Sequence, residues 1–223
     1  MSNANDVIPM VVIMLVGMVV LDQLYFIWSN GPIGTNVGFK TYDLPEARTF
    51  NGYGWGGSQS KQLIAAGMRK KLVIPVYAVG LYVSDSKEKE LNKCKSECSN
   101  KLSTPASESI GSAIVLKFQM AVGTNKVVNA IVDALPGKSK AYKDALSKFQ
   151  DVLLSGLGEN GAKTGDIVEF VFRGSNEIGV GVRGNVAGWI KNSELRSKLM
   201  DIYAGSKSVA PEVPKILKEN YYF

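Results

Sequence analysis

The stretch LIAAGMRKKLVIPVYAVGLYV, residues 63–83, decides the fold because it holds two apolar runs on either side of a short basic segment. Both runs are rich in β-branched and aromatic residues, a composition typical of strands. Pro75 has no N–H to give a neighbouring strand, so it favours an edge strand or a bulge. Arg69 lies within the same apolar material, and its permanent charge needs an anion. A structural carboxylate such as Asp133 and a bound ligand both remain open.

The segments after this stretch predict the rest of the domain. Strand patterns occur at 113–120, 166–172, 179–183 and 186–190, the last two joined by a predicted Gly-Asn turn. Helical patterns occur at 125–135, after Pro136-Gly137, and from a cap at Asn192 or Ser193. Residues 84–112 are polar and lysine-rich, which indicates a surface excursion with one short helix. This order of elements predicts an α+β domain whose antiparallel sheet is covered on one face by helices.

Residues 7–28 predict a single N-terminal transmembrane helix, because their apolar and aromatic run is about as long as a bilayer core of roughly 30 Å requires. A cleaved signal peptide is the alternative, but no basic segment precedes the run and no small-x-small site directly follows it. Asp22 within the run is either hydrated at the surface or paired with another membrane helix. The predicted organisation is a tail at 1–6, an anchor at 7–28, a linker at 29–60 and a domain at 61–223.

Composition excludes several classes of chemistry. The chain has no histidine, so Ser-His-Asp, Cys-His and HExxH sites are excluded. The two cysteines, Cys94 and Cys98, have no second pair to complete a metal site, and they form either a disulfide or two free thiols. The chain has a net charge of +6, but its sequence contains no nucleic-acid-binding motif and no phosphate-loop pattern. We therefore expect no metal, no cofactor and no nucleic-acid partner.

Three separated blocks together resemble the chalcone isomerase-like superfamily. The resemblance is closest to the compact, bacterial-type branch, which does not include the plant enzymes. The blocks are GMRKKLVIPVYAVGLYV, the helix at 125–135, and GDIVEFVFRGSNEIGVGVRGNVAGWIKNSELRSKLMDIYAG followed by Pro211. They appear in the family's order and span residues 60–218. The resemblance implies a sheet with helices on one face and a ligand cleft between them.

The resemblance also implies which residues bind a ligand. Chalcone isomerases proper use an arginine, which Arg69 matches, together with a threonine, a tyrosine, an asparagine and a late hydroxyl. In this chain Tyr77 stands at the threonine position. The tyrosine falls at about Lys126, the asparagine at about Asp133 and the late hydroxyl near Ile202. These departures speak against flavonoid cyclisation. Fatty-acid-binding members are similar in pairing the arginine with a tyrosine, the combination of Arg69 with Tyr77.

The implied ligand site therefore comprises Arg69, Tyr77, Tyr82 and Lys126, with no catalytic residue. Taken without the resemblance, the two tyrosines are typical core aromatics and Lys126 is a typical solvated lysine at a helix start. A guanidinium and a phenol OH together offer three donors to a carboxylate. Eight residues of straight strand would hold Arg69 and Tyr77 about 26 Å apart, so we predict that they lie on adjacent strands of a hairpin turning at 70–74.

Three functions follow from this reading. The first is a membrane-anchored, non-catalytic protein that binds a fatty acid or a similar acidic amphiphile. The second is an accessory subunit of a large organellar membrane complex, photosynthetic or respiratory, with a vestigial pocket. The third is an isomerase. The predicted location is a thylakoid or inner mitochondrial membrane, and the predicted partners are the acidic amphiphile, the membrane and other membrane subunits.

Overall fold

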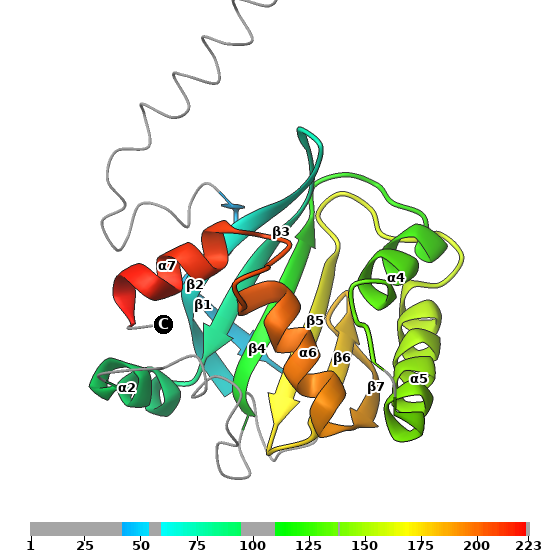
Figure 1. Ribbon diagram of the computed structural model, residues 1–223. Coiled ribbons are helices and arrows are strands. Elements are labelled where there is room, and N and C mark those ends of the chain that lie inside the picture. The colour runs from blue at the N-terminus through cyan, green and yellow to red at the C-terminus, as the bar shows by residue number, and fades with distance from the viewer. Residues whose placement is uncertain (1–41, 54–58, 95–109, 138, 222–223) are drawn as a thin grey trace, which may run out of the picture. The chain divides into compact units, whose positions relative to one another are not determined.

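The structure is a computed structural model that describes residues 42–53, 59–94, 110–137 and 139–221; the predicted tail and anchor lie outside them. Seven strands form one antiparallel sheet in sequence order (Figure 1). The strands are β1 (Ala47–Phe50), β2 (Gln59–Lys71), β3 (Ile74–Val83), β4 (Ile110–Phe118), β5 (Ile167–Arg173), β6 (Glu177–Val182) and β7 (Asn185–Lys191). The helices are α2 (Asp85–Lys93), α4 (Thr124–Val132), α5 (Lys140–Leu157), α6 (Ser193–Ala204) and α7 (Glu212–Asn220). The predicted α+β class is confirmed. Within the described ranges, none of the helices is long and apolar enough to cross a membrane.

The hairpin of β2 and β3 carries the stretch that decides the fold. Lys71 pairs with Ile74, so Leu72 and Val73 alone connect the two strands. The pairing then shifts between Arg69 and Lys70, which leaves Val76 of β3 as an extra residue. The bulge expected from Pro75 is therefore present. The alternative, an edge strand, is wrong because β3 lies between β2 and β4.

β1 lies where the sequence predicted a linker. Ala47–Phe50 pairs antiparallel with Gln59–Gln62 of β2, and the side chain of Phe50 is buried. The linker prediction follows from the density of Gly, Pro, Asn and Ser in residues 29–61. It missed the gain from burying Leu44, Phe50 and Tyr53, which outweighs weak local strand propensity. The packed domain thus includes residues on the N-terminal side of 61.

The sheet is covered on both faces, by different material. Helices α4 to α7 lie over one face (Figure 1), where Val152 of α5 packs against Gly188 and Val213 of α7 packs against Gly67. The segment 42–53 covers the other face. There Leu44 lies against Gly80. Tyr53, which follows β1, reaches Trp189 of β7 at 5.8 Å between ring centroids, so the two edges of the sheet curl toward each other.

The helices begin where the sequence predicts, whereas helix α7 and the β6–β7 turn differ from the prediction. Asn192 caps α6 by accepting from the Leu195 N–H at 2.8 Å, as predicted. The short helix expected in the polar excursion is α2. Helix α7 was not predicted, because Pro211 and Pro214 obscure its period. The turn between β6 and β7 is Arg183-Gly184 and not the predicted Gly-Asn, since Val182 pairs with Asn185 and both turn residues have positive φ.

Candidate functional site

Arg69 and Tyr77 are direct partners across the β2–β3 ladder. The Arg69 Cζ lies 5.8 Å from the centroid of the Tyr77 ring, an arrangement in which the guanidinium contacts the aromatic face. Tyr77 is buried and also contacts the Phe118 ring, whereas Arg69 is half-buried near the end of β2. The predicted convergence of this pair on adjacent hairpin strands is confirmed. The two-residue turn and the bulge at Val76 set the register that brings them together.

Tyr203 of α6 joins this pair from the helix layer. Its side chain is buried, and its hydroxyl lacks a partner with hydrogen-bond geometry among the described residues. Burial raises the pKa of Tyr203 well above its ordinary value, the nearby Tyr77 hydroxyl raises it further, and the charge of Arg69 opposes both effects. Burial likewise raises the pKa of Tyr77, against the effects of Arg69 and Tyr203. Both phenols are therefore protonated at neutral pH and able to donate.

No carboxylate among the described residues forms an ion pair with Arg69. Asp133, the carboxylate considered in the sequence analysis, is exposed at the C-terminal cap of α4. A half-buried guanidinium, a buried phenol and a buried hydroxyl without a partner form one cluster of donors. Such a cluster has more donors than acceptors and no anion among the described residues, and a carboxylate supplies two oxygens that accept charge-assisted hydrogen bonds.

The other predicted ligand residues lie apart from this cluster. Tyr82 lies on the opposite face of β3 from Tyr77, where its hydroxyl donates to the Pro45 carbonyl at 2.8 Å and its ring contacts Phe50. The structure thus separates Tyr82 from Arg69 and Tyr77, because residues five apart on a strand point to opposite faces. Lys126 is exposed in the first turn of α4, the solvated position expected of such a lysine.

Cys94 follows α2 and is disulfide-bonded. Cys98 lies outside the described residues, so its pairing with Cys94 stays a prediction. Cys94 lies at the C-terminal cap of α2 and is not part of the Arg69 cluster.

Sequence reasoning missed Tyr203 by one residue, since it aligned the late hydroxyl near Ile202. The available signal was helical spacing. Leu195, Leu199 and Tyr203 recur every four residues and form one buried stripe of α6. That stripe places the phenol over the sheet, whereas Ile202 is only half-buried.

A second buried cluster, on the opposite face of the sheet, is fully paired. Glu169 of β5 accepts from the Arg48 Nε at 2.8 Å and from the Tyr53 hydroxyl at 2.9 Å. Burial raises the pKa of Tyr53, and the negative charge of Glu169 raises it further. Each oxygen of the Glu169 carboxylate thus has a donor. The cluster ties the segment 42–53 to the sheet and needs no ligand.

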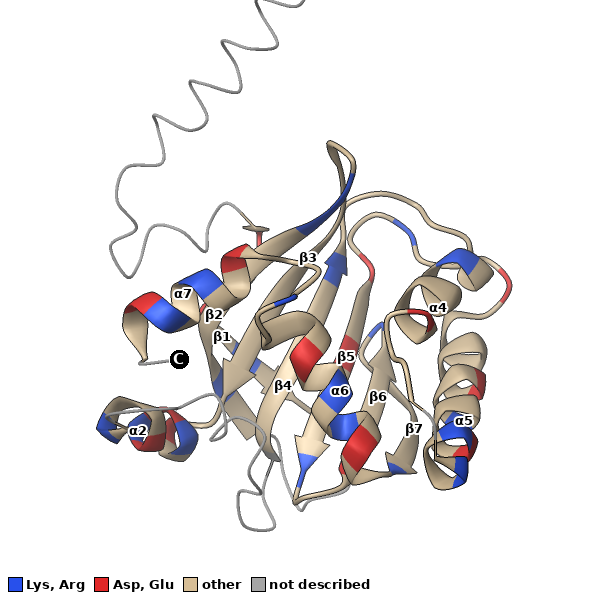
Figure 2. Cartoon of the chain, viewed as in Figure 1, with Lys and Arg blue, Asp and Glu red and all other residues tan. Residues whose placement is uncertain are grey.

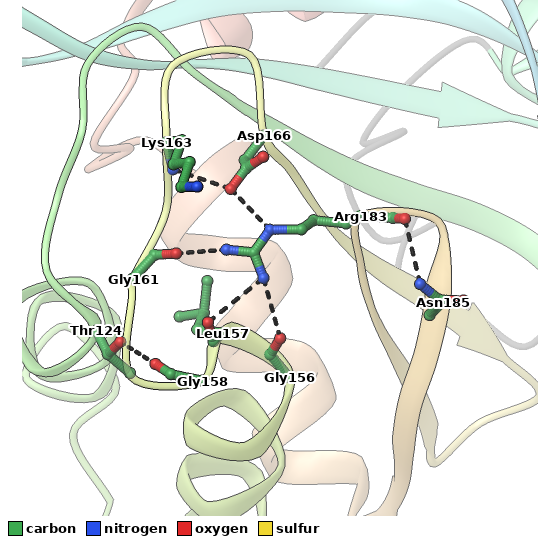
Figure 3. Close-up of polar contacts among 9 residues, drawn as sticks. All are labelled: Thr124, Gly156, Leu157, Gly158, Gly161, Lys163, Asp166, Arg183 and Asn185. Carbon is green, nitrogen blue, oxygen red and sulfur yellow. Dashed lines mark hydrogen bonds and ion pairs between the residues drawn. The ribbon is translucent and has the colours of Figure 1, made fainter.

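A third polar cluster surrounds Arg183 in the β6–β7 turn (Figure 3). Its Nε donates to Asp166 at 2.8 Å, its Nη1 donates to the carbonyls of Gly156 and Leu157 at 3.4 Å each, and its Nη2 donates to Gly161. A cation at these carbonyls complements the C-terminus of α5. Each nitrogen of the Arg183 guanidinium thus donates to an oxygen of the protein, so the cluster has a structural role.

Comparison with known proteins gives one family and one fold. A family profile described as chalcone isomerase-like matches residues 55–218. Among solved structures, the chain is similar to a fatty-acid binding protein from Arabidopsis thaliana, with a TM-score of 0.56 and 19% sequence identity. The similarity covers 78% of this chain and 97% of the Arabidopsis chain. No curated protein sequence matches the chain.

Proposed function

The chain belongs to the chalcone isomerase-like family, and from that premise we propose that it is a non-catalytic protein that binds a fatty acid or a similar acidic amphiphile. The observation that carries the proposal is the donor cluster of Arg69, Tyr77 and Tyr203, which has no carboxylate partner among the described residues. The ligand class is that named for the Arabidopsis structure of the same fold.

The chemistry of the cluster supports a carboxylate terminus. Arg69 presents a planar pair of donors, and the two phenols add single donors from the sheet and from α6. The side chains nearby are apolar, with Phe118 packed against Tyr77 and Phe170 against Tyr203. An acid with a hydrocarbon chain matches a polar end of this kind within apolar surroundings.

The non-catalytic part of the proposal rests on what accompanies Arg69. Lys126 and Asp133, which match the positions of the family's catalytic tyrosine and asparagine, are both exposed. Within the Arg69 cluster, as the described residues form it, the acid-base groups are the phenols of Tyr77 and Tyr203, and burial raises the pKa of each. A phenol with a raised pKa is a poor general base at neutral pH. Absence of chalcone turnover by the purified protein is the expected result.

Titration of the purified protein with a fatty acid and with the fatty alcohol of equal chain length tests the ligand. We expect the protein to bind the acid more tightly than the alcohol. Arg69→Ala is expected to weaken the affinity for the acid by about 10- to 100-fold and to leave the affinity for the alcohol unchanged. Arg173→Ala is the matched control, because Arg173 also lies over an aromatic ring, that of Trp189, but is ion-paired with Glu177. Equal affinity of Arg69→Ala and the unaltered protein for the acid would refute the proposal.

Membrane attachment through residues 7–28 is the second part of the proposal. It rests on the apolar run in the sequence, which lies outside the described residues. The full chain is expected to stay with membranes during alkaline carbonate extraction, and a variant with Val12→Arg and Leu15→Arg is expected to be released. An organellar location and a role as a subunit of a membrane complex stay predictions of the sequence.

A further inference from the structure

The tip of the β2–β3 hairpin exposes aliphatic side chains that the rest of the domain does not cover. Leu72 is 92% exposed, Val73 is 81% exposed and Ile74 is 54% exposed. Among the described residues, the next most exposed large hydrophobic side chain is Met120, at 38%. Met120 follows Gln119, whose N–H donates to the Val76 carbonyl at 2.9 Å, so it lies beside the base of the same hairpin. The hairpin projects beyond the sheet (Figure 1).

The backbone of the turn makes these residues costly for the isolated domain. Leu72 has a φ of +58°, a left-handed conformation that glycine and asparagine adopt readily and that costs other L-residues about 1 kcal/mol. Exposed leucine and valine gain no burial in return. Turn stability and solubility would both favour polar residues at these two positions. A partner that buries the tip accounts for their presence.

The charge around the tip indicates the nature of that partner. Lys70 and Lys71 precede Leu72, are exposed, and form no ion pair with any described residue. Figure 2 shows basic residues on the arm of the hairpin and no charged residue on its tip. A narrow apolar projection followed at once by lysines matches a lipid surface, where aliphatic side chains enter the acyl boundary and lysines contact anionic headgroups.

We propose that the hairpin tip, Leu72 to Ile74, inserts into the surface of an anionic lipid bilayer while Lys70 and Lys71 contact its headgroups. Arg69 is three residues from Leu72, so about 10 Å of strand separates the donor cluster from the inserted tip. Docking therefore holds Arg69 at headgroup depth. The proposal does not depend on the ligand of Arg69, because the tip and the lysines act without it.

A fluorescent amino acid at the tip tests this in the full chain. Dansylalanine replaces Val73, and the protein is reconstituted with phosphatidylcholine vesicles that either contain or lack phosphatidylglycerol. We expect a blue shift of the emission and quenching by doxyl-labelled lipid, both stronger with phosphatidylglycerol. The same label at the exposed Lys148 of α5 is the control and is expected to show neither effect.

Charge variants separate lipid contact from general adhesion. K70E with K71E is expected to abolish the blue shift and the quenching, whereas K70R with K71R is expected to retain both; circular dichroism should report an unchanged fold for each. An unshifted emission at position 73 in anionic vesicles would overturn the proposal. A blue shift without quenching by doxyl lipid would also overturn it, in favour of a protein partner or a second copy of this chain.

Discussion

Arg69 of β2 faces Tyr77 of β3 across the ladder, with its Cζ 5.8 Å from the ring centroid and no carboxylate partner among the described residues. The sequence leaves open whether Arg69 pairs with a structural carboxylate or with a bound ligand, and the structure shows no such carboxylate among the described residues. A buried salt bridge would leave Arg69 saturated and structural. Its contact with an aromatic face leaves the donor edge of the guanidinium able to bind an anion.

Tyr203→Phe is expected to weaken fatty-acid binding by about 5- to 50-fold without loss of stability. The substitution removes a buried hydroxyl whose neighbour, the Tyr77 hydroxyl, lies outside hydrogen-bond geometry, so its removal costs the fold little. Affinity by calorimetry and unfolding in urea are measured on the same protein. Unchanged affinity would remove Tyr203 from the site.

The matched control for that experiment is Tyr142→Phe. The Tyr142 hydroxyl is also buried, but it donates to the Leu135 carbonyl at 2.8 Å. This variant is expected to lose about 1 kcal/mol of unfolding free energy and to bind the ligand normally. The two tyrosines should therefore show opposite patterns.

Glu169→Gln is expected to lower the free energy of unfolding by about 2–3 kcal/mol. The change leaves the half-buried Arg48 without its counter-charge and weakens the bond from Tyr53. Glu219→Gln is the surface control, because Glu219 lies 4.0 Å from Lys215 in an exposed pair, and it should change stability by less than about 0.5 kcal/mol. A similar small effect for Glu169→Gln in urea unfolding would show that the cluster is dispensable.

Asp166→Asn is expected to destabilise the protein at neutral pH by about 1 kcal/mol, a modest value because Arg183 is partly exposed. Burial alone would raise the pKa of Asp166, but the Lys163 N–H and Arg183 bring it below its ordinary value of 3.8. A carboxyl with a lowered pKa stabilises the fold above that value and loses its contribution as the pH falls through the folded pKa. The difference between the variant and the unaltered protein should therefore shrink below about pH 4, as followed by urea unfolding.

Lys61→Met is expected to remove a pH dependence of the unfolding free energy in the alkaline range. Lys61 is fully buried, and burial lowers its pKa from 10.5 to about 8, against the attraction of Asp85. Between these two values the unfolded chain binds the proton and the folded chain does not, so this lysine penalises folding less as the pH rises. The unfolding free energy of the unaltered protein should therefore rise relative to that of the variant between pH 8 and pH 10.5. A constant difference between the two proteins over this range would contradict the lowered pKa of Lys61.

Leu72→Gly is expected to raise the free energy of unfolding by about 0.5–1 kcal/mol, since glycine adopts a φ of +58° without strain. The same change should reduce the doxyl quenching of a probe at position 73. For the stability measurement alone, Lys71→Gly is the control, because Lys71 is exposed and lies outside the turn. Loss of stability in Leu72→Gly would indicate that the leucine supports the fold itself.

Features that depend on neighbours in sequence were predicted well. The family resemblance, the α+β class, the hairpin of β2 and β3, and the meeting of Arg69 with Tyr77 are confirmed. Alternation and a short turn specify a hairpin almost completely, because its two strands lie close together in the chain. The same alternation, applied to Tyr77 and Tyr82, would have placed Tyr82 on the other face.

Contacts between segments far apart in the sequence could be identified only from the tertiary structure. The strand β1 exists because Leu44, Phe50 and Tyr53 find apolar partners on the sheet, and local composition carries no sign of those partners. Tyr203 reaches the Arg69 pair because α6 packs with one particular rotation on the sheet. That rotation follows from the fit of many side chains at once, and one residue's difference along a helix turns a side chain by about 100°. The sequence by itself determined that Arg69 needs an anion and meets Tyr77; only the packing of α6 decided that a third donor, Tyr203, stands beside them.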